Sequence, residues 1–309
     1  SHANVFNQDI GSWNTSSVAD MSEMFFSANA FNQNLNSWDV SNVTLMISMF
    51  HDSENFNGNI SSWITSNVTN MSNMFNGTSN FTQDINNWDV GNVTDMSGMF
   101  KNSSFNSNIA SWNVSNVLDT YQMFANAIYF NQNIENWNVA NVITMSEMFS
   151  NSESFNQNLG SWIVSTVLDF TSMLDNSGIS VENYDNILIS WSQQDLQNDL
   201  NLGAVGLFFC DAENERQSII NNFNWIINDE GIDPICDISS NVTPPPTTSE
   251  SSQLFCAQLS GNSLADILIE GENIHWDSSA AGLGKFPSHA AHLPQFQHNC
   301  VTATMSSMQ

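Results

Sequence analysis

The sequence predicts a repeat solenoid, in which short coils of chain stack along one axis, followed by an α/β cap and a small β-rich tail. Two observations support this prediction. A 25-residue motif recurs seven times in an almost unbroken register, and the periodicity then stops at Asp175. A unit of this length cannot bury its apolar face alone, whereas stacked copies shield one another and need a cap where the stack ends.

Four apolar columns define the repeat, and each advances in steps of 25, 25, 25, 24, 25 and 25 residues. The columns are Trp13, Trp38, Trp63, Trp88, Trp112, Trp137 and Trp162; Phe6, Phe31, Phe56, Phe81, Phe105, Phe130 and Phe155; Val18, Val43, Val68, Val93, Val117, Val142 and Val167; and Met24, Met49, Met74, Met99, Met123, Met148 and Met173. We expect the phenylalanine and methionine columns to form ladders inside the solenoid. The tryptophan column has two interpretations, an internal ladder or an exposed surface on which sugar rings stack, and we favour the internal ladder.

Each repeat is expected to contain one short strand and one short helix. The segments Phe31–Leu35 and Trp38–Val40 are β-prone and flanked by Asn and Ser, which is typical of a brief strand. The apolar positions that follow, at i, i+3, i+6 and i+7, are Val43, Met46, Met49 and Phe50. This spacing predicts a helix of about two turns, in part 3₁₀, with Ser41 or Asn42 as its N-cap. The single shorter step falls in the loop 101–104, where a deletion leaves the strand register unchanged.

The repeat pattern also resembles a known family. The combination Val-x-x-Met-x-x-Met-Phe, Phe-Asn-Gln-Asp/Asn-Ile/Leu and Trp-Asn/Asp-Val resembles the BspA-like leucine-rich-repeat surface proteins, which are common in Bacteroidetes and mycoplasmas and occur sporadically in protists. The resemblance covers about Val5 to Asp175. It implies a leucine-rich-repeat-like solenoid over residues 1–175, export from the cell, and attachment to cells, matrix or other microbes. It implies no catalytic residues.

Residues 176–238 are expected to form the α/β cap. The predicted elements are a helix around Tyr184–Trp191 with Ser180 as its cap, a strand over Ala204–Cys210, a helix over Ala212–Asn222, and a strand over Trp225–Ile227. An αβαβ order of this kind suits the end of a solenoid, where an open coil would expose its core. With its Asn-Tyr-Asp, Phe-Cys and Trp-x-Ile pieces, the segment is similar to those that close such arrays in flavobacterial proteins.

The rest of the chain divides into a linker and a tail. Residues 239–252 contain three consecutive prolines among Ser and Thr, which is typical of an extended linker. The tail, residues 253–309, contains Leu254-Phe255-Cys256, Ala265-Asp266-Ile267, Gly271-Glu272-Asn273-Ile274-His275-Trp276 and Cys300. With these segments it resembles the Ig-like β-sandwich modules of large Bacteroidetes adhesins exported by the type IX system. This resemblance extends to Trp276, and about 60 residues are short of a full sandwich, so we expect a partial β module.

The charge balance restricts the class of partner. Three basic residues stand against 31 acidic ones, giving a net charge of −28. Such a surface repels nucleic acid phosphates and anionic lipid headgroups, so we expect no binding to nucleic acid. The sequence has no apolar run long enough to span a bilayer, so direct membrane insertion is not expected either. No signal peptide is recognisable, and we expect the chain to be a mature fragment of an exported protein.

Four cysteines lie in the last third of the chain, and their even number suits two disulfides in an oxidising, extracellular setting. We favour the pairs Cys210–Cys236 and Cys256–Cys300, because each pair falls within one predicted unit. Four cysteines allow three connectivities, so the other two pairings stay open.

Two groups of residues suggest metal sites, and each has a simpler explanation. One column is always Asp or Asn, at Asp9, Asn34, Asn59, Asp84, Asn108, Asn133 and Asn158. Its oxygens could hold Ca²⁺, but we favour hydrogen bonds to the backbone, since only two members carry charge. A second Asn column, Asn42, Asn67, Asn92, Asn116 and Asn141, is expected to mark a turn or helix cap. His289, His292 and His298, with Cys300, have spacings that could suit Zn²⁺, against the expected Cys256–Cys300 disulfide.

The sequence therefore predicts a protein that is not an enzyme and needs no cofactor. No nucleophile elbow, phosphate loop or HExxH pattern occurs. We expect an acidic extracellular cell-surface module for adhesion, whose solenoid surface binds a host or microbial protein or glycan. The alternative is a structural stalk or filament subunit of an extracellular appendage, in which an open N-terminal coil stacks on a neighbour and the chains self-associate into fibres.

Overall fold

The computed structural model describes residues 3–236 with their side chains, and the backbone of residues 251–257 and 299–305. The chain divides into two compact units, residues 1–241 and 242–309. Its helices and strands are α1 (Val181–Trp191), β1 (Asn201–Gly203), α2 (Glu213–Phe223), β2 (Ile226–Asn228), β3 (Ser251–Ala257) and β4 (Asn299–Met305). Repeats and cap thus belong to the first unit.

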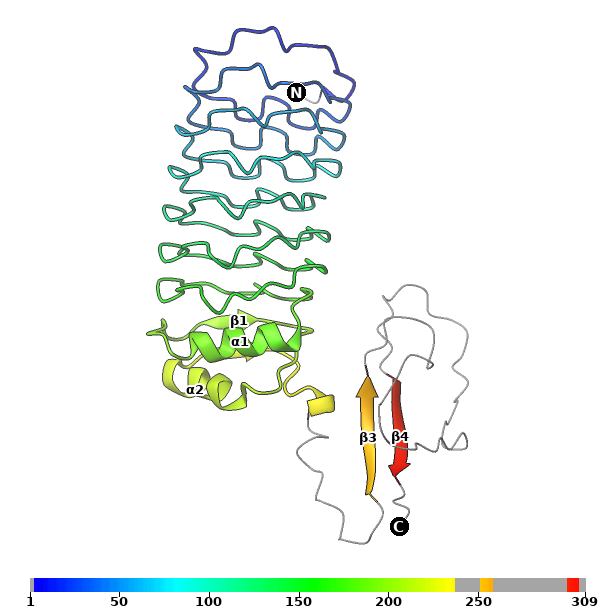
Figure 1. Cartoon of the computed structure of the whole chain (residues 1–309). Helices are drawn as coiled ribbons and strands as arrows, with labels where there is room; N and C mark the ends of the chain where they lie inside the picture. Colours follow the sequence, from blue (N-terminus) through cyan, green and yellow to red (C-terminus); the bar gives the residue numbers. More distant parts are fainter. Residues whose placement is uncertain (1–2, 237–250, 258–298, 306–309) are drawn as a thin grey trace. The chain divides into compact units, whose positions relative to one another are not determined.

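Seven coils of chain lie one above another in the first unit (Figure 1). We number them 1 to 7, and each begins at its column phenylalanine, Phe6 in coil 1 and Phe155 in coil 7. Single residues of successive coils form parallel bridges, Asp20–Leu45, Leu45–Asn70, Asn70–Asp95, Asp95–Asp119, Asp119–Thr144 and Thr144–Asp169. Every coil therefore contacts the next at the same position of the repeat.

The segment that carries each bridge is a run of tight turns. In coil 2, alternate N–H groups from Met46 to Asp52 donate to carbonyl oxygens of coil 3 at 2.7 to 3.0 Å, and the Met49 N–H closes a turn on the Met46 carbonyl. Ser48 and Asp52 have φ angles of 53° and 56°. The same left-handed pair recurs at Glu23 and Ser27, Asn73 and Gly77, Gly98 and Asn102, Gln122 and Asn126, Glu147 and Asn151, and Ser172 and Asn176. These positions hold Gly or a residue with a short or flexible polar side chain.

The expected strand and helix in every repeat are not what the structure contains. Residues 3–179 include no helix, and no strand longer than a single-residue bridge. A helix over 43–50 would require right-handed φ and bonds from each N–H to the carbonyl four residues earlier. Ser48 instead has positive φ and donates its N–H to coil 3. The pairing expected near Phe31–Leu35 occurs at Leu45, within the stretch predicted to be helical.

Aromatic ladders fill the centre of the stack. The phenylalanine that follows the column methionine stacks on its counterpart in the next coil with ring centroids 5.3 to 5.7 Å apart, from Phe25 through Phe149. The column phenylalanines stack in the same way, as at Phe31–Phe56 and Phe130–Phe155. Such offset pairs add to the stabilisation from apolar burial.

The tryptophan column lies at the edge of this core. Trp38, Trp63, Trp88, Trp112, Trp137 and Trp162 are at most 5% exposed. Each indole Nε1 donates to a carbonyl oxygen of the preceding coil at 2.9 to 3.2 Å, for example Trp88 to Ile60. These six rings are therefore not a surface for sugar stacking. Trp13 in coil 1 is 52% exposed and differs from the rest of its column.

Helix α1 closes the stack after coil 7. Ser180 caps the helix and accepts a hydrogen bond from the Asn183 N–H, as its sequence position predicts. The apolar face of α1 is buried, including Leu188 and Trp191. After α1 the chain returns to the stack, where Leu202 of β1 bridges Phe170 of coil 7.

Strands β1 and β2 pair in parallel, with Leu202 opposite Ile227. The strand expected over Ala204–Cys210 is replaced by β1, which lies earlier in the chain, and by a single bridge at Phe209. The backbone turns between them, because Gly206 has a φ of 88° and the Leu207 N–H bonds to the Ala204 carbonyl. The apolar run 204–210 thus supplies core residues from a turn.

The second unit contains the antiparallel pair β3 and β4. Cys256 lies directly opposite Cys300 in their register. The side chains of both strands and the remainder of the tail lie outside the described residues, so the predicted Cys256–Cys300 disulfide and the Ig-like module remain predictions. Among the helices that the structure describes, none has the length and apolar character needed to cross a bilayer.

Candidate binding surface

One outward column of the stack changes character along its length. It follows the column valine and consists of Ala19, Thr44, Thr69, Thr94, Leu118, Ile143 and Leu168. Backbone bonds of 2.8 to 2.9 Å join each member to the one before it. Leu118, Ile143 and Leu168 are 42%, 44% and 56% exposed. We call these three residues the aliphatic stripe.

The threonines of the same column are engaged within the stack. The Oγ1 hydroxyls of Thr44, Thr69 and Thr94 donate to carbonyl oxygens of the preceding coil at 3.1 to 3.2 Å. Leu, Ile and Leu cannot make this bond, so coils 5 to 7 give up three hydrogen bonds and expose aliphatic groups instead. Exposed apolar side chains aligned on successive coils are a feature of interaction surfaces.

The bridge position lies one residue after this column in each coil. Beside the aliphatic stripe it is acidic in two coils, where Asp119 follows Leu118 and Asp169 follows Leu168, and it is Thr144 after Ile143. Asp95 holds the same position in coil 4, before the stripe begins. Burial raises the pKa of the Asp119 carboxyl, the Tyr121 N–H bond opposes that rise, and the neighbouring charge of Asp95 adds to it. Burial also raises the pKa of the Tyr121 phenol, with the charge of Glu147 as the next cause. The stripe is therefore bordered by negative charge.

The asparagine columns, by contrast, hold the coils together. Asn32 Oδ1 accepts the N–H of Asn57 at 2.8 Å, and Asn106 and Asn131 do the same for the next coils at 2.9 Å. The predicted turn column, Asn42, Asn67, Asn92, Asn116 and Asn141, uses each Nδ2 to donate to a carbonyl of the preceding coil at 2.7 to 2.8 Å. Much of the amide surface is thus structural.

The Asp/Asn column considered for Ca²⁺ forms local turns. In all seven coils the side-chain Oδ1 accepts the N–H two residues later at 2.8 to 3.0 Å, from Asp9 to Asn158. Within the part of the chain that the structure describes, no group of three or more His, Cys, Asp or Glu residues could hold a metal ion. His289, His292 and His298 lie outside that part, so the zinc hypothesis concerns undescribed residues.

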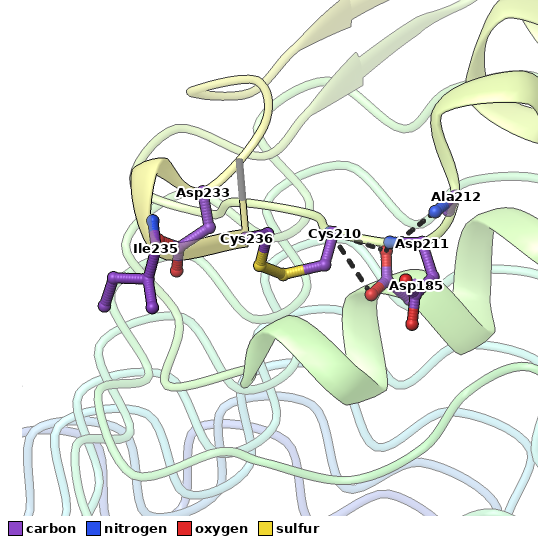
Figure 2. Close-up of a disulfide and its surroundings, with 7 residues drawn as sticks. All are labelled: Asp185, Cys210, Asp211, Ala212, Asp233, Ile235 and Cys236. Carbon is purple, nitrogen blue, oxygen red and sulfur yellow. Dashed lines mark hydrogen bonds between the residues drawn. A yellow bond between two sulfur atoms is a disulfide. The ribbon is translucent and has the colours of Figure 1, made fainter. Parts of the chain in front are cut away.

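A disulfide joins Cys210 to Cys236 in the cap (Figure 2). Beside it, the buried Asp185 of α1 accepts the N–H groups of Cys210, Asp211 and Ala212 at 3.0 to 3.2 Å. These donors precede α2, whose own N-cap residue, Ala212, supplies no side-chain bond. Asp185 therefore caps α2 from another helix, which is a structural role.

The aliphatic stripe was not among the sites expected from the sequence. Its signal is a change within one column, from Thr in coils 2 to 4 to Leu or Ile in coils 5 to 7. Sequence reasoning misreads this change, because leucine and isoleucine in a repeat normally indicate core positions. Only the stacked backbone places the column outward.

The chain was compared with known families and proteins. A family model described as Mycoplasma protein of unknown function, DUF285, matches residues 1–104 and again residues 80–191. Together the two matches span the seven coils and α1. None of the curated proteins in the comparison matches the chain.

Proposed function

The chain belongs to DUF285, a repeat family of unknown function that includes BspA-like repeat proteins, and on this premise we propose that it is a non-catalytic adhesion module of the cell surface. In this proposal the outer face of the stack binds a host or microbial surface protein or glycan. The rigid stack presents side chains, and the partner supplies complementary groups at several coils at once.

The aliphatic stripe is the observation that carries this proposal. Three exposed aliphatic side chains on neighbouring coils repeat at the spacing of stacked strands, about 4.8 Å. Burying them under a partner releases water from apolar surface, and the adjacent carboxylates of Asp119 and Asp169 favour a partner with basic groups. A protein ligand with apolar and basic side chains fits both features, and a glycan can use its apolar ring faces on the same stripe.

An extracellular location is part of the proposal. The Cys210–Cys236 disulfide supports it, because such bonds persist in oxidising compartments. We extend the proposal to a leucine-rich-repeat-like class for the solenoid, to membership of the BspA-like surface proteins, and to an origin in Bacteroidetes with an Ig-like tail. The support for these finer assignments is the sequence resemblance alone.

A stalk or filament subunit is the second candidate, and the exposed Trp13 favours it. An open first coil could stack on a neighbouring molecule. The two candidates differ in the surface they use, since adhesion uses the side of the stack and a filament uses its ends. Electron microscopy of the purified chain separates them, because fibres support the filament and dispersed particles support adhesion.

The binding test uses the full chain on a glycan array and on immobilised extracellular matrix and cell-surface proteins. For each ligand found, the variant L118T/I143T/L168T restores the threonine that coils 2 to 4 carry in the same column. We expect its affinity to fall by about tenfold or more, as for loss of a buried apolar contact at an interface. Raised salt should weaken binding to a basic partner.

The matched control is I64T/I163T/I226T, which changes three other exposed isoleucines. This control should bind as the unmodified chain does. Equal loss in both variants, or full binding by L118T/I143T/L168T, would contradict the role of the stripe. Measurable turnover of polysaccharides or peptides would contradict the non-catalytic assignment.

A further inference from the structure

The stack of coils contains one lysine, and its amine contacts a side-chain amide. Lys101 in coil 4 is the only lysine or arginine among residues 3–179. Its Nζ donates to the side-chain Oε1 of Gln122 in coil 5 at 2.6 Å. Within residues 3–236 Lys101 forms no ion pair, although the chain has 31 acidic residues. Charge pairing therefore does not explain where this amine is placed.

A carboxylate lies on the other side of the same amide. The Nε2 of Gln122 donates to Oε2 of Glu147 in coil 6 at 2.6 Å. Amine, carboxamide and carboxylate thus follow one another across coils 4, 5 and 6, and all three side chains are half-buried. We call Lys101, Gln122 and Glu147 the amide triad.

The backbone of the stack fixes the amide triad in place. Gln122 and Glu147 occupy the first left-handed position of their coils, with φ angles of 55° and 53°. Their N–H groups donate to carbonyl oxygens of the next coil at 3.0 and 2.8 Å, and the Lys101 carbonyl accepts the Gly77 N–H at 2.9 Å. The folded stack therefore holds the amine against the amide, which removes the entropic cost of an encounter between them.

The contact between Lys101 and Gln122 spans the one irregular step of the repeat. The step from coil 4 to coil 5 is one residue shorter than the others, and the missing residue falls in the loop 101–104. The asparagine ladder is interrupted at the same step. Thr82 takes the place of asparagine in coil 4, so it has no amide oxygen to accept the N–H of Asn106. The amide triad thus joins coils 4 and 5 where the asparagine ladder does not.

We propose that Lys101 and Gln122 form an isopeptide cross-link within the chain, with Glu147 as the acid–base catalyst. The neutral amine of Lys101 attacks Cδ of Gln122, and a new C–N bond forms. Glu147 takes the proton that the attacking nitrogen loses and passes it to Nε2, so that the old C–N bond breaks and ammonia leaves. One amine and one primary amide become one secondary amide, with no oxidation or reduction and no further reactant.

The cross-link goes beyond the adhesion proposal and does not depend on it, because it concerns how the coils are joined. Ammonia diffuses into the solvent, so the new amide persists once it has formed. Lys101 and Gln122 are 21 positions apart. A bond between them restricts the unfolded chain as a disulfide does, and it stabilises the middle of the stack.

Trypsin provides a direct test, because the chain has only three cleavage sites, at Lys101, Arg216 and Lys285. Trypsin does not cleave after a lysine whose amine is acylated. The full chain is reduced, unfolded in urea and digested, and its fragments are measured by mass spectrometry. We expect residues 1–216 to stay together, lighter than their sequence by one ammonia, with Lys101 and Gln122 joined. Separate fragments 1–101 and 102–216 at their sequence masses overturn the proposal.

Three variants of the full chain serve as controls in the same digest. Lys101→Arg keeps the positive charge but has no reactive amine, so trypsin should cleave after residue 101 and release fragments of unmodified mass. Glu147→Gln removes the catalytic carboxylate, so most of the chain should be cleaved at Lys101. Glu153→Gln changes an exposed carboxylate of the same coil and should be cross-linked as fully as the unmodified chain. Full cross-linking of Glu147→Gln overturns the role given to Glu147.

Discussion

The indole Nε1 of Trp191 donates a hydrogen bond to the carbonyl oxygen of Leu159 at 3.2 Å. Each tryptophan from coil 2 to coil 7 makes this bond to the preceding coil, so a residue of α1 takes the place of an eighth column member. Asn183 of α1 likewise bonds the Asn156 side chain at 2.8 Å, where earlier coils use Gln. Helix α1 therefore makes the side-chain hydrogen bonds that the next coil of the stack would make, although its backbone is helical.

The tryptophan column should show a steep difference between its first and its central members. Trp88→Ala removes a buried ring and leaves the Ile60 carbonyl without its donor, so we expect a loss of about 3 to 5 kcal/mol in the free energy of unfolding. Trp13→Ala, at an exposed position of the same column, should cost about 1 kcal/mol or less. Urea unfolding of both variants measures the contrast, and equal losses would contradict it.

Substitution by glycine should not destabilise the residues with positive φ, whereas it destabilises residues in a helix. Because Ser48 has a φ of 53°, Ser48→Gly should be neutral or stabilising by up to about 1 kcal/mol, and Ser48→Val should destabilise by about 1 to 2 kcal/mol. A helix would give a loss of about 1 kcal/mol for the glycine variant. Thermal unfolding of the Ser48 variants distinguishes the turn from the helix. Glu54→Gly is the control, because Glu54 has a negative φ and should lose stability with glycine.

The disulfide should contribute measurably to the stability of the cap. Cys210 and Cys236 are 26 residues apart, and a loop of that length corresponds to about 3 to 4 kcal/mol of restricted unfolded-state freedom. C210S/C236S should lose this amount in urea unfolding. The variant C256S/C300S keeps the cap disulfide and should still lose stability when dithiothreitol is added. If neither C210S/C236S nor dithiothreitol lowers the free energy of unfolding, the expected contribution of the disulfide is wrong.

Alkaline pH should weaken the cap through Tyr184. Burial raises the pKa of this phenol well above its usual value, and the charge of Asp229 contributes to the rise. The raised pKa stabilises the fold fully below about pH 10, where the unfolded phenol is also protonated, and that contribution is lost as the pH rises through the folded value. Unfolding midpoints should therefore stay level between pH 8 and about pH 10 and fall at higher pH.

The variants Tyr184→Phe and Tyr129→Phe provide the comparison. The first removes the titrating group, together with its 2.9 Å bond to Asp229, and should flatten the alkaline decline from a lower starting stability. The second changes an exposed tyrosine and should leave the decline unchanged. A decline of the same size in Tyr184→Phe would assign it to another group.

Sequence patterns predicted the positions of the repeat better than its local backbone. The structure agrees with three predictions: the register of the columns, the Ser180 cap and the approximate bounds of both cap helices. Each of these follows from apolar spacing or from capping chemistry within a few residues of the sequence. The helix predicted at Val43–Phe50 is absent. A run of tight turns that includes left-handed residues can also place every third or fourth side chain inward, so the apolar spacing does not distinguish the two backbones. The Asn and Ser residues that permit positive φ are the local signal for such turns.

The aliphatic stripe shows a second limit of sequence reasoning. Whether Leu118 points inward or outward depends on the direction of the chain one residue after a buried valine, and the inter-coil bonds decide that direction.

The turn-built coils also affect how this protein would be recognised by spectroscopy. Residues 3–179 include no helix and no extended strand, yet alternate amide groups in the turn segment of each coil bond to the next coil, and others close turns within a coil. Circular dichroism in the far ultraviolet responds to regular helices and sheets, so the spectrum should resemble that of a largely unstructured polypeptide. Sharp, cooperative melting and well-dispersed amide resonances should accompany it. A screen that discards samples on dichroism alone would reject a fully folded molecule.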